Sequence, residues 1–192
     1  MAYFVFAEFG NDGVVNFLTA LRRALQAKSD VSPIHVTLRG PYKKPPTLSQ
    51  LDGYAEQLKG LGVRIGSGGS FDTPKGFAVF LRAECSVFPN LWDKPDFRVP
   101  RKHIQPHITV FESSSWNAAR KVRDFLLEQD FVIHTYNVHL SIYQSRNMQG
   151  DFFTRPIAVP LARSMNRDIV RIPEGMLQLA HELGAQLARS AT

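Results

Sequence analysis

"PIHVTLRG" (residues 33–40) and "IQPHITVF" (residues 104–111) are the stretches that decide the fold of this chain. Each sets a histidine and a threonine two positions apart among apolar and β-branched residues, a composition typical of strands. Alternate side chains of a strand share one face, so His35 lies beside Thr37, and His107 beside Thr109. Two strands with the same polar pair predict one site assembled from two related segments.

The segments around these strands follow a common order, which indicates an internal duplication. Each His-x-Thr strand precedes a helix, a strand, a glycine-containing turn and an aromatic-rich strand, "GFAVF" in the first half and "GDFF" in the second. His35 and His107 are 72 residues apart, and Gly76 and Gly150 are 74 apart. We therefore expect an α+β, bilobal fold, in which two antiparallel sheets with outer helices bring the His-Thr strands face to face across a central cleft.

Hydrophobic periodicity and turn signals predict the individual elements. Strands are expected at 2–9, 34–38, 131–143 and 151–159, a hairpin at 62–72 and 76–84, and helices at 11–25, 47–58 and about 115–129. Gly40-Pro41 is expected to end the strand at 34–38, and Thr47 with Gln50 to form a capping box. The two-lobed domain covers residues 1–160. Residues 161–192 form an extension whose amphipathic C-terminal helix either packs on its own domain or forms a dimer contact; we favour a monomer.

Composition limits the classes of function. The chain has 192 residues and a single cysteine, Cys85, so it can form no internal disulfide, and a cysteine-based zinc site is not expected. It contains no run of 18 apolar residues and no signal-peptide pattern at its start, so we expect no membrane span and a cytoplasmic protein. The net charge of +6 favours an anionic partner. Basic residues gather beside both motifs: Arg39, Lys43, Lys44, Lys94, Arg98, Arg101 and Lys102.

The paired residues suit proton transfer around an anion. A histidine titrates near neutrality, so two of them can supply a base and an acid for one reaction. Two threonine hydroxyls can donate hydrogen bonds to the oxygens of a tetrahedral phosphate, where negative charge develops in the transition state. This chemistry requires no metal and no cofactor, and we predict none.

"HVTL" (35–38) and "HITV" (107–110) resemble the paired H-x-[ST]-x motifs of the two-histidine (2H) phosphoesterases, the LigT-like or 2′-5′ RNA ligase-like proteins. The resemblance spans about residues 1–160. "LSIYQSRNMQGDFF" (140–153) also looks like a hairpin of the RNA 2′,3′-cyclic phosphodiesterase branch. The resemblance implies a bilobal duplicated fold, acid-base catalysis by His35 and His107, and phosphate binding by Thr37 and Thr109. It also implies RNA or a nucleotide with a cyclic phosphate as the substrate.

Strand alternation adds two substrate-binding candidates. Arg39 follows His35 and Thr37 on the same side and could contact a phosphate, although a solvated arginine fits equally well. Phe111 follows His107 and Thr109 in the same way and could stack on a base or belong to the core.

Other histidines offer less. "HLSI" (139–142) fits the motif but breaks the duplication, so His139 is expected to be a sheet residue or cleft wall. His103 and His107 have the spacing of helical zinc ligands, but Pro106 between them disfavours a helix.

Three hypotheses stay open at this point. The first is a metal-independent phosphodiesterase that hydrolyses a 2′,3′-cyclic phosphate. The second is a 2′-5′ RNA ligase or phosphodiesterase, or a hydrolase of small cyclic nucleotides. The third is a non-catalytic RNA- or nucleotide-binding module, which the presence of both intact His-Thr pairs disfavours.

Overall fold

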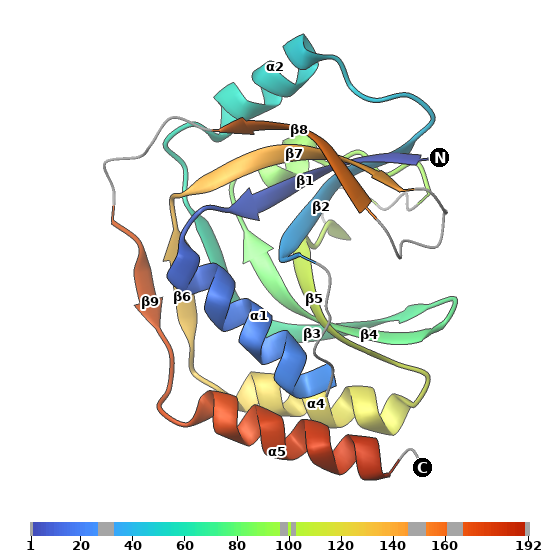
Figure 1. Cartoon of the computed structure of the whole chain (residues 1–192), viewed down its shortest axis with the longest axis vertical. Helices are drawn as coiled ribbons and strands as arrows, with labels where there is room; N and C mark the ends of the chain where they lie inside the picture. The colour runs from blue at the N-terminus through green and yellow to red at the C-terminus, as the bar shows by residue number, and fades with distance from the viewer. Residues whose placement is uncertain are drawn as a thin grey trace.

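The structure is a computed structural model that describes residues 2–26, 33–96, 100, 103–145, 153–160 as backbone, and 167–190. Figure 1 shows the arrangement of its elements. The strands are β1 (Ala2–Phe9), β2 (His35–Tyr42), β3 (Val63–Thr73), β4 (Gly76–Glu84), β5 (His107–Ser113), β6 (Val132–Thr135), β7 (Val138–Ser145), β8 (Phe153–Pro160) and β9 (Ile169–Arg171). The helices are α1 (Asp12–Gln26), α2 (Leu48–Leu58), α3 (Phe88–Leu91), α4 (Trp116–Glu128) and α5 (Met176–Arg189).

The strands form two antiparallel sheets, and the fold is α+β as predicted. One sheet has the order β2-β1-β7-β8, and the other has the order β5-β4-β3-β6-β9. All named strand pairs in both sheets are antiparallel. In the part of the chain that the structure describes, β2 and β5 are edge strands of different sheets, and each begins with the histidine of its motif.

The duplication is visible in the strand order. β2-β1-β7 in one sheet corresponds to β5-β4-β3 in the other: a motif strand, then a central strand, then a third strand. β3 follows the first motif along the chain but joins the sheet of the second, and β7 does the reverse. The two halves of the chain therefore exchange their third strands, so that each sheet contains residues from both halves.

Two sequence predictions need correction. The stretch 131–143, predicted as one strand, contains β6 and most of β7, which belong to different sheets and are separated by Tyr136 and Asn137. "GFAVF" lies in β4, which occupies beside β5 the place that β1 occupies beside β2, so its counterpart is β1 rather than "GDFF". Gly150, whose spacing from Gly76 suggested the match between "GFAVF" and "GDFF", lies outside the described residues. Local patterns carry no information about which sheet a strand joins.

Of two local predictions, the structure confirms one and contradicts the other. Thr47 caps α2, accepting a hydrogen bond from the Gln50 amide while the Gln50 side chain accepts one from the Thr47 amide, so the capping box is confirmed. The predicted stop at Gly40-Pro41 is wrong, because β2 continues through this pair to Tyr42. β2 is an edge strand, and there a proline need not remove a ladder hydrogen bond.

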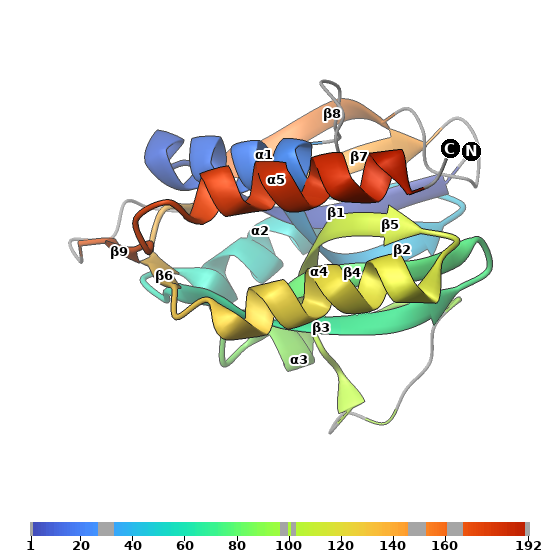
Figure 2. The ribbon, with the colours of Figure 1, turned by 90° about the horizontal axis from the view of Figure 1, so that it is seen from below.

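The C-terminal helix packs on its own domain, which is the first of the two alternatives that the sequence left open. α5 lies along α1 (Figure 2), and Gly184 of α5 comes so close that a Cβ there would be 2.0 Å from the carbonyl oxygen of Ala24. α1 in turn contacts β5. Its buried stripe includes Leu18, Leu21 and Leu25, which belong to the common core. The C-terminal helix therefore holds α1 from outside, and α1 contacts one motif strand.

Candidate active site

The two motif strands meet where the edges of the sheets come together. β2 and β5 contact each other (Figure 1), although no hydrogen-bonded ladder pairs them within the described residues. His35 and His107 are the first residues of these strands. His107 is close enough for its charge to lower the pKa of His35. The structure thus brings the two predicted histidines into electrostatic range at the seam between the sheets.

Each histidine is oriented by the same hydrogen bond. His35 Nδ1 lies 2.8 Å from the carbonyl oxygen of Pro33, and His107 Nδ1 lies 2.7 Å from that of Gln105. A carbonyl can only accept, so in both rings Nδ1 carries the proton of this bond. In the neutral ring Nε2 is then left as the acceptor, which is the state of a general base. The partner is the residue two positions earlier in both motifs, so the orientation follows from the strand itself.

Aromatic side chains pack against both imidazoles. Phe6 of β1 stacks on His35, with ring centroids 3.8 Å apart and 13° between the planes. Phe80 of β4 lies 4.9 Å from His107, and Phe71 of β3 lies 5.0 Å from it. Phe6 pairs with Thr37 and Phe80 pairs with Thr109 across their strands, so the two phenylalanines hold equivalent positions. Phe71 remains 37% exposed, which leaves one aromatic surface beside His107 open to a ligand.

The surroundings favour neutral imidazoles. The pKa of His35 is lowered to about 4, chiefly by burial and further by the charges of Arg22 and His107. The Pro33 carbonyl and Glu8 act in the opposite direction. Burial also lowers the pKa of His107. The hydrogen bond to the Gln105 carbonyl raises this pKa, and the charge of Lys94 lowers it further. A bound phosphate would supply the negative charge that stabilises a protonated ring.

A β-bulge follows the threonine in each motif. Thr37 pairs with Phe6 and Arg39 with Val5, so Leu38 is the extra residue of β2. In β5, Thr109 pairs with Phe80 and Phe111 with Val79, so Val110 is the extra residue. A bulge sets two residues of one strand against one of the other and breaks the alternation of faces beyond it. Both motifs therefore carry their irregularity at the same position.

The bulge overturns the alternation argument for Phe111. Val110 and Phe111 are both buried, Phe111 is only 6% exposed, and both belong to the hydrophobic core. The alternation reaches Thr109 but not beyond, so the assignment of Phe111 to substrate binding is wrong and its core role is the one observed.

Arg39 follows the corresponding bulge and is held by neighbours on other elements. Its guanidinium donates to an Asp93 carboxylate oxygen at 3.0 Å and to the Leu91 carbonyl at 2.8 Å. It also lies over the ring of Tyr54 in α2, 4.5 Å from the centroid. These contacts give Arg39 a structural role, and its contact with a phosphate stays a prediction.

A buried carboxylate that the sequence analysis missed lies on the strand next to His35. Glu8 of β1 pairs directly with His35 on one side and with His139 on the other. Its carboxylate accepts hydrogen bonds from Ser141 and from Tyr143, the latter at 2.7 Å, and His139 Nε2 lies 3.4 Å from it. Burial raises the pKa of Glu8, but the hydrogen bonds outweigh this effect and lower it to about 2. His139 is thus a sheet residue, as predicted, and its Nε2 lies beside the Glu8 carboxylate, which is ionised at neutral pH.

Arg22 of α1 is the second missed residue. It is 6% exposed, and its guanidinium donates to the Thr109 carbonyl and, at 3.3 Å, to the Pro33 carbonyl. The sequence did contain a signal, because Arg22 falls between Leu18 and Leu25 in the apolar stripe of its helix. A charged residue at such a position is rarely buried without partners.

Other predicted features are exposed or lie outside the described residues. His103 is exposed. The basic residues Arg98, Arg101 and Lys102 are outside the described residues. Among the residues that are described, no group of three histidine, cysteine, aspartate or glutamate side chains is placed to hold a metal ion. Nor is any helix in that part of the chain long and apolar enough to cross a membrane.

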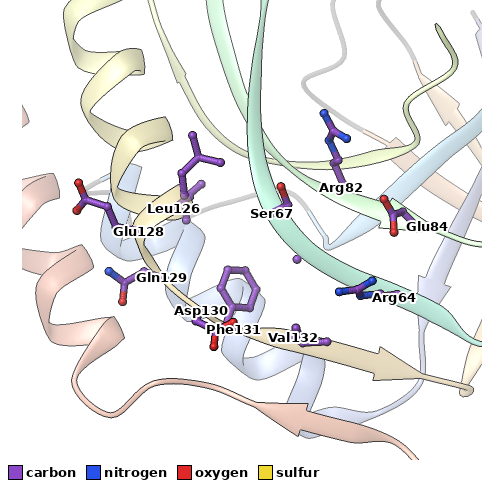
Figure 3. A pocket seen from close by; sticks show the side chains of 12 residues that line it. Arg64, Ser67, Arg82, Glu84, Leu126, Glu128, Gln129, Asp130, Phe131 and Val132 are labelled. Carbon is purple, nitrogen blue, oxygen red and sulfur yellow. The ribbon is translucent and has the colours of Figure 1, made fainter.

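A separate hollow of about 350 Å³ lies between β3 and the C-terminal end of α4 (Figure 3). Arg64, Ser67 and Arg82 line one side, and Leu126 and Phe131 line the other. None of the predicted site residues lines it.

The chain matches no protein-family model and no curated protein sequence.

Proposed function

We propose that this protein is a 2H phosphoesterase that hydrolyses the 2′,3′-cyclic phosphate of RNA or of a nucleotide without a metal ion. The observation that carries the proposal is the repeated motif geometry. Two histidines with the same Nδ1 hydrogen bond begin edge strands that contact each other, and a threonine follows each of them by two residues. The proposal includes a monomeric cytoplasmic enzyme.

The proposed reaction assigns one step to each histidine. Nε2 of one neutral imidazole accepts a proton from water as the water oxygen attacks phosphorus. The bond between phosphorus and one ribose oxygen breaks, and the second histidine, protonated in the substrate complex, gives its proton to that oxygen. Thr37 and Thr109 donate hydrogen bonds to the non-bridging oxygens, whose negative charge increases in the transition state.

The first test is a substrate panel with matched variants. Purified protein is assayed with 2′,3′-cyclic mononucleotides, RNA that ends in a cyclic phosphate, and 2′-5′-linked dinucleotides, each with and without EDTA. Hydrolysis of a cyclic phosphate that EDTA leaves unchanged is the expected result. Loss of activity in EDTA with recovery on adding a divalent ion would contradict the metal-independent mechanism.

The variants separate catalysis from binding. His35→Ala and His107→Ala should each lose on the order of 10²–10⁴-fold in rate, and the double variant little more, because both groups act in one transition state. Thr37→Ala and Thr109→Ala should each lose about 1.5–3 kcal/mol of transition-state stabilisation. His181→Ala, an exposed histidine of α5, is the control and should keep wild-type activity. Binding of a cyclic nucleotide without turnover would favour a binding module instead.

A further inference from the structure

Arg22 is a buried cation in the helix that packs beside the proposed active site. It is 6% exposed and lies in the same helical stripe as the fully buried Leu18, Leu21 and Leu25. The pKa of Arg22 is lowered to about 10 by burial, with the charge of Glu112 opposing the change, so the side chain keeps its charge near neutral pH. Burying a charge is costly unless hydrogen bonds compensate it, so the partners of this guanidinium indicate why it is there.

Among the described residues, two of those partners are backbone carbonyls, one beside each motif. Nη2 donates to the carbonyl oxygen of Thr109, which lies directly before the bulge of β5. Nη1 donates at 3.3 Å to the carbonyl oxygen of Pro33, two residues before His35. One guanidinium therefore spans the seam between two strands that no ladder joins in the described residues. The planar fork of an arginine suits this bridge, because its donors have a fixed separation.

The Pro33 carbonyl has a second donor. It accepts from His35 Nδ1 at 2.8 Å, the bond that orients this imidazole. Arg22 and His35 thus share one acceptor, and the charge of Arg22 lowers the pKa of His35. Among the described residues, Glu8 also raises the pKa of His35, and the charge of His107 lowers it.

We infer that Arg22 is a positioning residue for the proposed reaction, one that fixes the spacing of the two motif strands and, through the Pro33 carbonyl, the orientation of the His35 ring. This inference rests on the proposed function for its kinetic consequence. We assign Arg22 no contact with a reacting atom: its guanidinium donates to the Pro33 and Thr109 backbone carbonyls, whereas the groups proposed to act on the phosphate are side chains of the motif strands.

The test compares three variants. Arg22→Met removes the charge and the hydrogen bonds to the Pro33 and Thr109 carbonyls at similar volume. Arg22→Lys keeps the charge but not the fork, and Arg23→Met alters the exposed neighbour in the same helix. Each is measured for thermal unfolding, for kcat and KM on a 2′,3′-cyclic mononucleotide across pH, and for histidine titration by NMR. A misplacement of about 1 Å in a catalytic group can cost on the order of 100-fold in rate.

The expected pattern is specific to a positioning role. Arg22→Met should stay folded and lose about 10- to 100-fold in kcat with KM nearly unchanged. In Arg22→Met, the pKa of His35 should rise, because the positive charge of Arg22 beside the imidazole is gone. The limb of the pH–rate profile that reports the titration of His35 should move to higher pH by the same amount. If that limb is the acidic one, His35 is the base. Arg22→Lys should lose rate while its His35 titration stays nearer to wild type, and Arg23→Met should match wild type in all measurements.

Two outcomes would overturn the inference. One is an Arg22→Met variant with the kcat and His35 titration of Arg23→Met; the other, should Arg22→Met fail to fold, is an Arg22→Lys variant with wild-type kcat. Failure of the proposed function is recognised separately, because wild-type protein would then hydrolyse no cyclic phosphate. In that event the His35 titration decides: an unchanged titration in Arg22→Met refutes the inference, and a shift supports the placement of the Arg22 charge beside His35 on which the inference rests.

Discussion

Lowering the pH from about 7 to about 5 should reduce the free energy of unfolding by about 2 kcal/mol through His35 alone. In the folded protein its ring is stacked on Phe6 and its pKa is lowered to about 4, chiefly by burial, whereas the unfolded chain has the ordinary value of 6.5. Between these values the unfolded state binds a proton that the folded state does not. The contribution of His35 to the free energy of unfolding is therefore fully present above pH 6.5, and it decreases as the pH falls toward the folded-state pKa of about 4.

The magnitude follows from the width of this interval. Each pH unit below the ordinary value costs about 1.36 kcal/mol until the folded-state pKa is reached. The interval from 6.5 to about 4 therefore gives about 3 kcal/mol in full, and the part above pH 5 gives about 2 kcal/mol. Stopping at pH 5 keeps Glu8 ionised in the folded state, because its pKa is lowered to about 2.

Urea unfolding at several pH values measures this effect, with His35→Asn as the perturbation. An asparagine amide can still donate to the Pro33 carbonyl but does not titrate, so the variant should lose about 2 kcal/mol less than wild type between pH 7 and pH 5. His181→Asn, at an exposed position of α5, should follow the wild-type curve. Parallel curves for wild type and His35→Asn would refute the argument, because His35 would then have the same pKa in both states.

Two further predictions concern stability at neutral pH and are checked by urea or thermal unfolding. Gly184→Ala should destabilise the protein by about 1–3 kcal/mol, because the new Cβ would lie 2.0 Å from the Ala24 carbonyl oxygen and must push α5 away from α1. The control Gly53→Ala, in α2 with no atom within 4 Å of the new Cβ, should instead stabilise it by about 0.5–1 kcal/mol, and equal effects at the two sites would contradict the packing argument. Glu8→Gln should cost about 1–3 kcal/mol, because it removes the charge that Ser141 and Tyr143 donate to; a change under about 0.5 kcal/mol would show that the carboxylate contributes little.

The sequence was sufficient for features that depend on neighbouring residues. The alternation in "HVTL" and "HITV" predicted two strands with a histidine and a threonine on one face, and both strands are present: β2 begins at His35, one residue after the predicted start, and β5 begins at His107. The spacing of Thr47 and Gln50 predicted the cap of α2 correctly. In each case one turn or one strand contains all the atoms that make the interaction, so a short window of sequence holds the information.

The sequence was insufficient where distant segments decide the outcome. Residues 131–143 were predicted as one strand, yet β6 pairs with β3 and β7 pairs with β1, in different sheets. Arg22 could be noticed as a charge within an apolar stripe, but it donates to the backbone carbonyls of Pro33 and Thr109, a group that every residue has. No residue type marks such an acceptor in advance, so a buried arginine that bonds the backbone is found only from the structure.

The wrong prediction for Phe111 has a structural cause, the extra residue that follows the threonine of each motif. A strand without irregularities would carry the face of His107 and Thr109 on to Phe111, but the extra residue Val110 turns Phe111 into the core. The first motif has its extra residue, Leu38, at the same position. Phe111 is thereby withdrawn from the shared face in β5, so we expect the contribution of this strand to the proposed site to end at Thr109. In β2 the burial still alternates past the extra residue, with Leu38 and Gly40 buried and Arg39 half-buried between them, so the phosphate contact of Arg39 stays a prediction there.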